Sequence, residues 1–393
     1  MANRFFLIII MFIVICQDII EKAINSDSID NKYAIETLKK ILLSVKWRKH
    51  IIFAPGLREE DIENIKNVLT TEEVKLLKYV HSKRLDSNSL MNKLSVMARI
   101  TFEESTKKDD KIIYINPKNN QSFELFEETH FIVENILDSL FYRKVICNYY
   151  QRKNKIHTAC YSVSFYPVQG GGATISEVLK FEIDLSQHFC FVIGDSDKKC
   201  TGYRIEGDTA KGIRSMVKEY ENRKGQSPFN IDFYIMSKTR EIENLIPQCI
   251  LDIYSNKRQR DFLNRYNNLL AFFDFKVGME YKILYNNDVY NGWKMVFPND
   301  INWEQIDAIK ATSGTQAEFE NKLKELELPK LVEEWGKNIL NKVLYPTTKK
   351  QKDSIHKLYD ISEKDLTPSQ KDEWENIGKD VFSWCCCFTN PVY

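Results

Sequence analysis

The sequence predicts an α/β protein with a mostly parallel sheet and helices on both faces. Three observations in the middle of the chain predict this fold. Segments rich in β-branched and aromatic residues alternate with segments of helical apolar period. The segments between strand candidates are long enough for the helical crossovers that parallel strands require. Several strand candidates end in glycine or acidic residues, as in sheets that bind a ligand at the carboxyl ends of their strands.

The predicted elements follow one another in a regular order. They are a strand at 122–127, a helix at 129–144, a strand at 161–169, a helix at 175–187, a strand from 189 to Asp195, a helix at 208–223 and a strand at 231–236. Together they define a central domain at 121–258. We expect mainly helical regions on either side of it, at 1–120 and 259–393. The first of these contains the capping-box pattern Thr70-x-x-Glu73, which predicts a helix from residue 71.

An acidic pair, Asp195 and Asp197, follows the apolar strand at 189–194. Because Ser196 separates the two, an extended backbone would place both carboxylates on the same side. Two oxygen donors beside Lys198 and Lys199 are suited to a Mg²⁺ ion shared with a phosphate. The alternative for such a pair is a turn or the cap of the following helix.

Further candidate residues lie at the ends of the other strands. A cluster of three glycines, Gly170, Gly171 and Gly172, either forms a turn that needs positive φ or presents backbone N–H groups to a phosphate. After the last strand, Glu241 and Glu243 either bind a metal or favour the start of a helix through its dipole.

These motifs together resemble a TOPRIM domain, over about 121–257. The chain is most similar to overcoming-lysogenization-defect nucleases and to the TOPRIM effector of PARIS-type anti-phage systems. The resemblance assigns the strand-end glutamate to Glu127, the glycine turn to Gly170–Gly172, the acidic pair to Asp195 and Asp197, and the last motif to Glu243 or Glu241. It implies a Mg²⁺- or Mn²⁺-dependent site that cuts phosphodiester bonds in DNA or RNA.

The sequence departs from the family pattern in its first motif, which normally reads Glu-Gly with an Asp a few residues later. Here Glu128 occupies the place of that glycine, so either Glu127 or Glu128 could be the ligand. The chain also lacks the G-x-x-x-x-G-K-[ST] motif, so any ATP would be bound by a partner chain.

The expected roles follow from the chemistry of phosphodiester hydrolysis. Carboxylates would hold one or two cations, and a spare glutamate would act as general base. Basic side chains would neutralise the transition state or bind the nucleic-acid backbone. The candidates are Lys198, Lys199, Lys238, Arg240, Lys257 and Arg258.

Composition sets broader limits. The net charge of +1 over 393 residues gives no global attraction to nucleic acid, so binding would need local basic patches. Nine cysteines without C-x-x-C spacing favour a reducing, cytoplasmic location. We interpret Cys385–Cys387 as a packed terminus beside Trp384, and the tryptophans as core. The six histidines form no ligand spacing such as H-E-x-x-H.

The apolar segment 5–16 near the N-terminus is too short to span a bilayer. A membrane anchor, a buried helix and an oligomer contact remain open, and we favour burial against the body of the protein or a partner.

Three functions are compatible with these observations. The favoured one is a metal-dependent nuclease that acts as a bacterial anti-phage effector. The alternative is a catalytically degenerate TOPRIM-shaped interaction subunit of a defence complex. A primase-like nucleotidyl transferase is a weaker third. The expected partners are nucleic acid, a protein such as an ATPase or inhibitor subunit, and a second copy of the chain.

Overall fold

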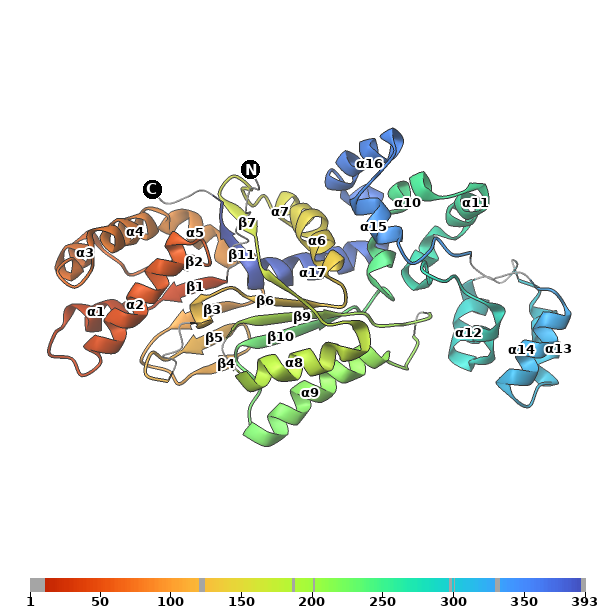
Figure 1. Cartoon of the computed structure of the whole chain (residues 1–393), viewed down its shortest axis with the longest axis horizontal. Coiled ribbons are helices and arrows are strands. Elements are labelled where there is room, and N and C mark those ends of the chain that lie inside the picture. The colour runs from red at the N-terminus through yellow and green to blue at the C-terminus, as the bar shows by residue number, and fades with distance from the viewer. Residues whose placement is uncertain are drawn as a thin grey trace. The chain divides into compact units, whose positions relative to one another are not determined.

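The protein has an α/β architecture with two sheets that are mostly parallel (Figure 1). The computed structural model describes residues 11–119, 124–185, 188–200, 202–296, 299, 301–328 and 333–389. The chain forms two compact units. The first comprises Met1–Gly194, Gly212–Tyr234 and Glu375–Tyr393, and the second comprises Asp195–Lys211 and Ile235–Trp374. The predicted α/β class is confirmed, but this division does not coincide with the predicted boundaries at 120 and 258.

One sheet of the first unit lies in the region that we predicted to be mainly helical. Its strands, in spatial order, are β2 (Ile51–Phe53), β1 (Phe12–Ile15), β3 (Met97–Ile100), β5 (Ile112–Ile115) and β4 (Lys107–Asp109). All neighbours are parallel except β4 and β5, which form an antiparallel pair. The prediction for 1–120 therefore missed a sheet. The strands of this sheet are too short for an alternation of apolar and polar residues to be recognised between the helices.

Five helices accompany this sheet. They are α1 (Gln17–Ile24), α2 (Asn31–Lys46), α3 (Glu59–Ile65), α4 (Thr71–Ser82) and α5 (Arg84–Met91). The predicted capping box at the start of α4 is confirmed. The amide of Glu73 donates to Thr70 Oγ1 at 3.2 Å, and the amide of Thr70 donates to Glu73 Oε2 at 2.7 Å. These bonds satisfy two amides that have no partner within the helix itself.

The described part of the apolar segment near the N-terminus is strand β1. Each of its residues is buried, and β1 pairs with both β2 and β3. Burial against the body of the protein is thus confirmed for Phe12–Ile15, in a strand rather than a helix; residues 5–10 lie outside the described residues. Among the helices of the described chain, none is long and apolar enough to cross a membrane.

The second sheet has the order β10 (Ile231–Ile235), β9 (Cys190–Gly194), β6 (His130–Val133) and β8 (Tyr166–Gln169). Strand β6 runs parallel to both β8 and β9, with Val133 opposite Gln169 and Ile132 opposite Val192. The carboxyl ends of these three strands therefore lie at the same edge of the sheet. Three predicted strands are confirmed, at 161–169, 189–195 and 231–236. The segment 161–169 is interrupted, however, and forms two strands, β7 (Tyr161–Val163) and β8.

The prediction for 122–144 was wrong in its first half. Residues 122 and 123 lie outside the described chain, and Glu124–Phe126 is a turn of 3₁₀ helix. The strand is instead β6, and helix α6 (Ile136–Phe141) begins only after it. Phe131, Ile132 and Val133 are all buried in a strand with neighbours on both sides. Such an unbroken apolar run lacks strand alternation, so it can be mistaken for part of a helix.

The helices next in the chain continue the first unit. After α6 come a π-helical turn (Tyr142–Ile146), α7 (Cys147–Lys153) and α8 (Ile175–Leu185). Helix α9 (Asp208–Lys224) begins in the second unit and ends in the first, and α17 (Pro368–Cys385) does the same.

The C-terminal strand β11 (Cys386–Phe388) pairs antiparallel with β7 in the first unit. Cys385, Cys386 and Cys387 are buried as free thiols, and the Trp384 ring stacks on Phe191 with centroids 5.9 Å apart. Burial raises the pKa of the Cys387 thiol to about 12. The packed terminus is confirmed, and burial disfavours the reactive thiolate form of its cysteines.

The second unit is helical in its described part. It contains α10 (Gln248–Tyr254), α11 (Lys257–Tyr266), α12 (Asn287–Val296), α13 (Trp303–Ala311), α14 (Gln316–Glu325), α15 (Ile339–Leu344) and α16 (Lys349–Tyr359). The predicted tryptophan core is confirmed by Trp293, Trp335 and Trp374, which are at least 94% buried. The Trp374 indole donates to Leu245 O at 3.0 Å, which ties the start of α17 to this unit.

Candidate functional site

The glycine turn lies at the end of β8 and is bonded to the end of β6. The Gly170 amide donates to Val133 O at 2.7 Å, and the Gly171 amide donates to Glu134 O at 2.9 Å. Gly171 and Gly172 have φ of 68° and 58°, a region that glycine adopts at little cost. Two of the three amides that we expected to face a phosphate therefore donate to carbonyl groups at the end of β6 instead.

Glu134, rather than Glu127, is the glutamate at the carboxyl end of a strand. It directly follows β6, and a Cβ on Gly172 would lie 3.1 Å from its Oε1 atom. Glu127 instead precedes β6, so it lies toward the opposite end of that strand, where its carboxylate pairs with Lys49. Glu128 also precedes the strand, and burial raises the pKa of its carboxyl group. The original assignment was displaced because it took the strand to be at 122–127.

The sequence contains a local pattern that indicates a strand ending before Glu134. The apolar run Phe131–Val133 is followed by Glu134 and Asn135, and Asp138 comes four residues after the glutamate. Asn135 caps α6 by accepting a hydrogen bond from the Leu137 amide at 3.0 Å. A glutamate after a buried apolar run, followed by a helix cap, is the local signal that could have located Glu134 from the sequence.

The loop that carries Asp195 and Asp197 is held against residues 239–240 within the second unit. The amides of Ser196 and Asp197 donate to Arg240 O at 2.9 and 3.1 Å, and Ser196 Oγ donates to Thr239 O at 2.7 Å. These bonds bring the acidic loop next to the segment that continues into Glu241. The sequence order alone does not specify this contact.

The two aspartates do not share one side of an extended strand. Strand β9 ends at Gly194, and Asp197 has a φ of 55°, in the left-handed region. Asp195 is buried, whereas Asp197 is half-buried with its carboxylate over Gly207. A Cβ on Gly207 would lie 2.1 Å from Asp197 Oδ2, so a side chain there would displace the carboxylate. The predicted alternation was wrong because the backbone turns after Gly194.

Glu241 and Glu243 form a buried acidic pair around Lys276. Their exposed fractions are 5% and 3%, and Lys276 Nζ lies 3.3 Å from Glu241 Oε2 and 3.2 Å from Glu243 Oε2. Burial and the nearby charge of Glu243 raise the pKa of Glu241 to about 8. Within the described part of the chain, Glu241 Oε1 has no hydrogen-bond partner. Lys276 is thus shared between two buried carboxylates, and among the described residues one oxygen of Glu241 is left without a hydrogen bond.

The segment around this pair is fixed by buried polar contacts. The Glu241 amide donates to Asn244 Oδ1 at 2.9 Å, and the Asn244 amide group donates to Leu270 O and Phe273 O at 2.5 and 2.9 Å. Gln370 donates to the Asn244 carbonyl at 2.9 Å. The backbone that carries the pair is therefore held at several points.

Four of the predicted basic residues lie either directly after the acidic pair or in the segment 238–240 that is hydrogen-bonded to its loop. Lys198 Nζ donates to Ser237 O at 2.8 Å, and the Lys199 carbonyl accepts from the Trp293 indole at 2.9 Å. Lys238 is exposed, with its amide bonded to the buried Glu373 carboxylate. The Arg240 guanidinium is paired with Asp274 at 2.7 Å, so much of its charge is neutralised.

The two other basic candidates begin helix α11. Lys257 and Arg258 are exposed, and Arg258 lies 3.7 Å from Glu333. Such surface pairs are weak and leave the guanidinium accessible to a phosphate.

Comparisons with protein-family models, with curated proteins and with solved structures found no match to this chain.

Proposed function

We propose that this chain is a divalent-metal-dependent nuclease that hydrolyses phosphodiester bonds in DNA or RNA and acts as an anti-phage effector. The observation that carries the proposal is the buried pair Glu241 and Glu243, which follows the segment bonded to the loop of Asp195 and Asp197. Clusters of carboxylates with a raised pKa are more common at functional sites than elsewhere in proteins.

The residues present are of the kind that Mg²⁺ or Mn²⁺ binds, although, within the described chain, no three of Asp195, Asp197, Glu241 and Glu243 have carboxylate oxygens within 4.8 Å of one another. Both ions prefer oxygen ligands, and the buried, unpartnered Oε1 atom of Glu241 is such an oxygen. Asp195, Asp197, Glu241 and Glu243 are the residues that would hold the ion. When bound, the ion would polarise the scissile phosphate and lower the pKa of a water molecule. The protein would contribute a fixed backbone around these acids, and Lys198 and Lys238 as charges for the phosphate.

The proposal includes a TOPRIM-like arrangement with one assignment changed. Glu134 takes the place first given to Glu127, and Asp138 supplies the aspartate of the same motif. Support comes from the position of Glu134 after a strand of the parallel sheet and from the glycine turn beside it. Nucleic acid is the proposed substrate, and a regulatory protein, such as an ATPase or inhibitor subunit, is the proposed partner.

The alternative is a TOPRIM-shaped interaction subunit without catalysis. The ion pairs from Lys276 to both Glu241 and Glu243 favour it, because a lysine can neutralise a carboxylate pair in place of a metal. In that case the chain would bind its partner but cleave nothing.

A cleavage assay with a matched pair of variants separates these hypotheses. Purified full-length chain is incubated with supercoiled plasmid, single-stranded DNA and total tRNA, with Mg²⁺, Mn²⁺ or EDTA. We expect metal-dependent cleavage of at least one substrate. Glu134→Gln should reduce the rate by about 10-fold or more, as for residues that support a metal site. Glu127→Gln should keep the wild-type rate, since it removes only the ion pair with Lys49.

Each other outcome has a clear meaning. Loss of activity in Glu127→Gln but not in Glu134→Gln would restore the original alignment. Absence of cleavage of all three substrates with either metal would contradict the nuclease proposal and favour the interaction subunit.

A further inference from the structure

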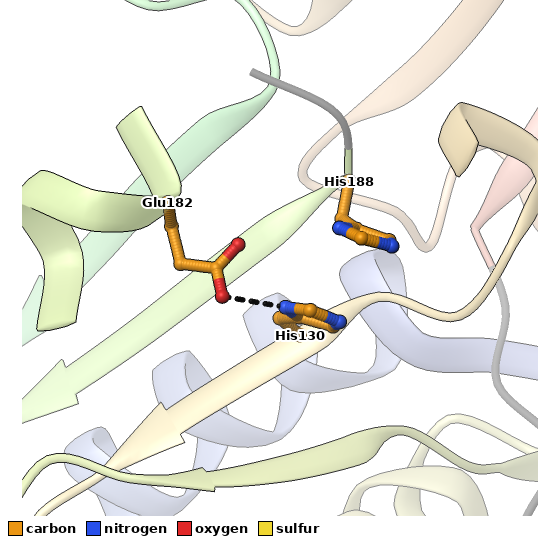
Figure 2. A group of neighbouring side chains, drawn as sticks. All are labelled: His130, Glu182 and His188. Atoms are coloured by element: carbon orange, nitrogen blue, oxygen red, sulfur yellow. Dashed lines mark hydrogen bonds and ion pairs between the residues drawn. The ribbon is translucent and has the colours of Figure 1, made fainter. Parts of the chain in front are cut away.

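A second group of ligand-type side chains lies in the first unit, at the end of β6 opposite to Glu134 (Figure 2). His130 is the first residue of β6, Glu182 belongs to α8, and His188 precedes β9. One candidate ligand atom from each residue lies within 4.8 Å of the others. The nuclease proposal involves Glu134, which follows the carboxyl end of β6. The group around His130 lies at the start of the same strand and is therefore a separate site.

The backbone on both sides of the group is fixed by the sheet. The His130 amide donates to Phe189 O at 2.7 Å, and His130 lies opposite Cys190 in the parallel pair β6–β9. The His188 carbonyl accepts a hydrogen bond from the Asn230 side chain at 2.6 Å. Two histidines 58 positions apart are thus held side by side by strand pairing rather than by local spacing, which is why the sequence did not reveal them.

The three side chains lie close together. His130 Nδ1 and Glu182 Oε1 are 2.7 Å apart, and the rings of His130 and His188 are stacked with centroids 4.0 Å apart at 17°. Figure 2 shows Glu182 reaching from its helix toward the edge of the histidine pair. Glu182 is buried, with 6% of its surface exposed, and its Oε2 atom accepts a hydrogen bond from the Cys190 thiol at 3.5 Å.

We propose that His130, Glu182 and His188 form a binding site for a borderline transition-metal ion, with Zn²⁺ as the preferred ligand. Two imidazole nitrogens and one carboxylate oxygen are a frequent zinc donor set, whereas Mg²⁺ prefers oxygen ligands only. Tetrahedral coordination separates its ligand atoms by about 3.3 Å. To bind one ion, His130 and Glu182 would have to move apart, and the His188 ring would have to turn out of its stack on His130.

The consequence is a metal link between helix α8 and the starts of strands β6 and β9. The ion would replace the hydrogen bond between His130 and Glu182 with two bonds to metal and would add His188. Three protein ligands leave a fourth position for water. The site would therefore stabilise the first unit.

Metal titration of the full chain tests this proposal. The protein is prepared without a polyhistidine tag, stripped with EDTA and dialysed, and then titrated with Co²⁺ and Zn²⁺. We expect one equivalent of Co²⁺ to produce the visible absorption of a tetrahedral ion, Zn²⁺ to displace it, and Zn²⁺ to raise the melting temperature. Absence of the Co²⁺ band together with an unchanged melting temperature would overturn the proposal.

Variants locate the site. His188→Ala and Glu182→Gln should each weaken Zn²⁺ binding by about 10-fold or more. His157→Ala, at an exposed histidine, should bind as wild type. Asp195→Ala should also bind Zn²⁺ normally, which separates this site from the proposed nuclease site. Circular dichroism of each variant checks folding, and Glu182→Gln keeps the shape of the side chain if His188→Ala is unstable. Wild-type affinity in both folded variants would contradict the assignment.

Discussion

Asp195→Ala should abolish metal-dependent cleavage of nucleic acid while leaving the protein folded. We expect the rate to fall by about 100-fold or more, since even residues that only support metal ligands contribute 10- to 100-fold. The loop should persist because its backbone is held by hydrogen bonds from the Ser196 and Asp197 amides to Arg240. Removing one acid from a crowded acidic segment also relieves repulsion, so the melting temperature without metal should stay level or rise slightly.

The measurement combines cleavage rates with melting curves, with and without Mn²⁺. Asp208→Ala is the matched control, because Asp208 is an acid of the same unit whose side chain is 98% exposed. It should cut and melt as wild type. If Asp195→Ala cleaves nucleic acid at the wild-type rate, or if its melting temperature falls well below that of wild type, then Asp195 only stabilises a turn.

Glu241→Gln should stabilise the protein at alkaline pH by an amount that disappears in acid. The folded-state pKa of Glu241 is about 8, above the ordinary value of 4.5, because the carboxyl group is buried beside Glu243. The folded state therefore retains a proton that the unfolded chain releases. Its contribution to stability is complete below about pH 4.5 and is lost as the pH rises through about 8.

Glutamine resembles the protonated acid at every pH, so the variant avoids this loss. At about 1.4 kcal/mol per pH unit, the difference is at most about 5 kcal/mol, and partial solvation or rearrangement would reduce it to about 2 kcal/mol. The test is the free energy of unfolding in denaturant at pH 5 and pH 8.5, for wild type, Glu241→Gln and the exposed control Glu325→Gln. If wild type and Glu241→Gln differ in free energy of unfolding by the same amount at both pH values, the raised pKa of Glu241 is contradicted. If Glu241 also binds the proposed metal, the same variant should lose cleavage activity.

The sequence predicted the sheet elements whose patterns are local. Strands β8, β9 and β10 are short runs of β-branched and aromatic residues, bounded by glycine or polar residues, and all three were placed within a few positions. Strand β6 was missed because its consecutive buried residues show no alternation. Strand β1 was missed because its apolar run resembles a leader or a buried helix until its pairing with β2 and β3 is known.

The candidate site was predicted to the same extent and for the same reasons. Asp195 and Asp197 were found because they follow a recognisable strand, and Glu134 was missed because its strand was missed. The contact of Lys276 with Glu241 and Glu243 joins segments more than thirty residues apart, and the pairing of His130 with His188 depends on strand neighbours. Contacts of this kind are products of the fold, so no spacing rule applied to one sequence can find them.

The pairing of β11 with β7 has a consequence for how the chain is made. Residues 375–389 complete the first unit, where Cys386 pairs with Val163 and the Ser95 amide donates to Ser383 Oγ across a separation of 288 positions. During translation, the ribosome must therefore synthesise the second unit before the first can close around its last strand. Contacts so distant in sequence form slowly, and a nascent chain remains open while they are missing. Any activity that needs a closed first unit would thus begin only after residues 375–389 have left the ribosome.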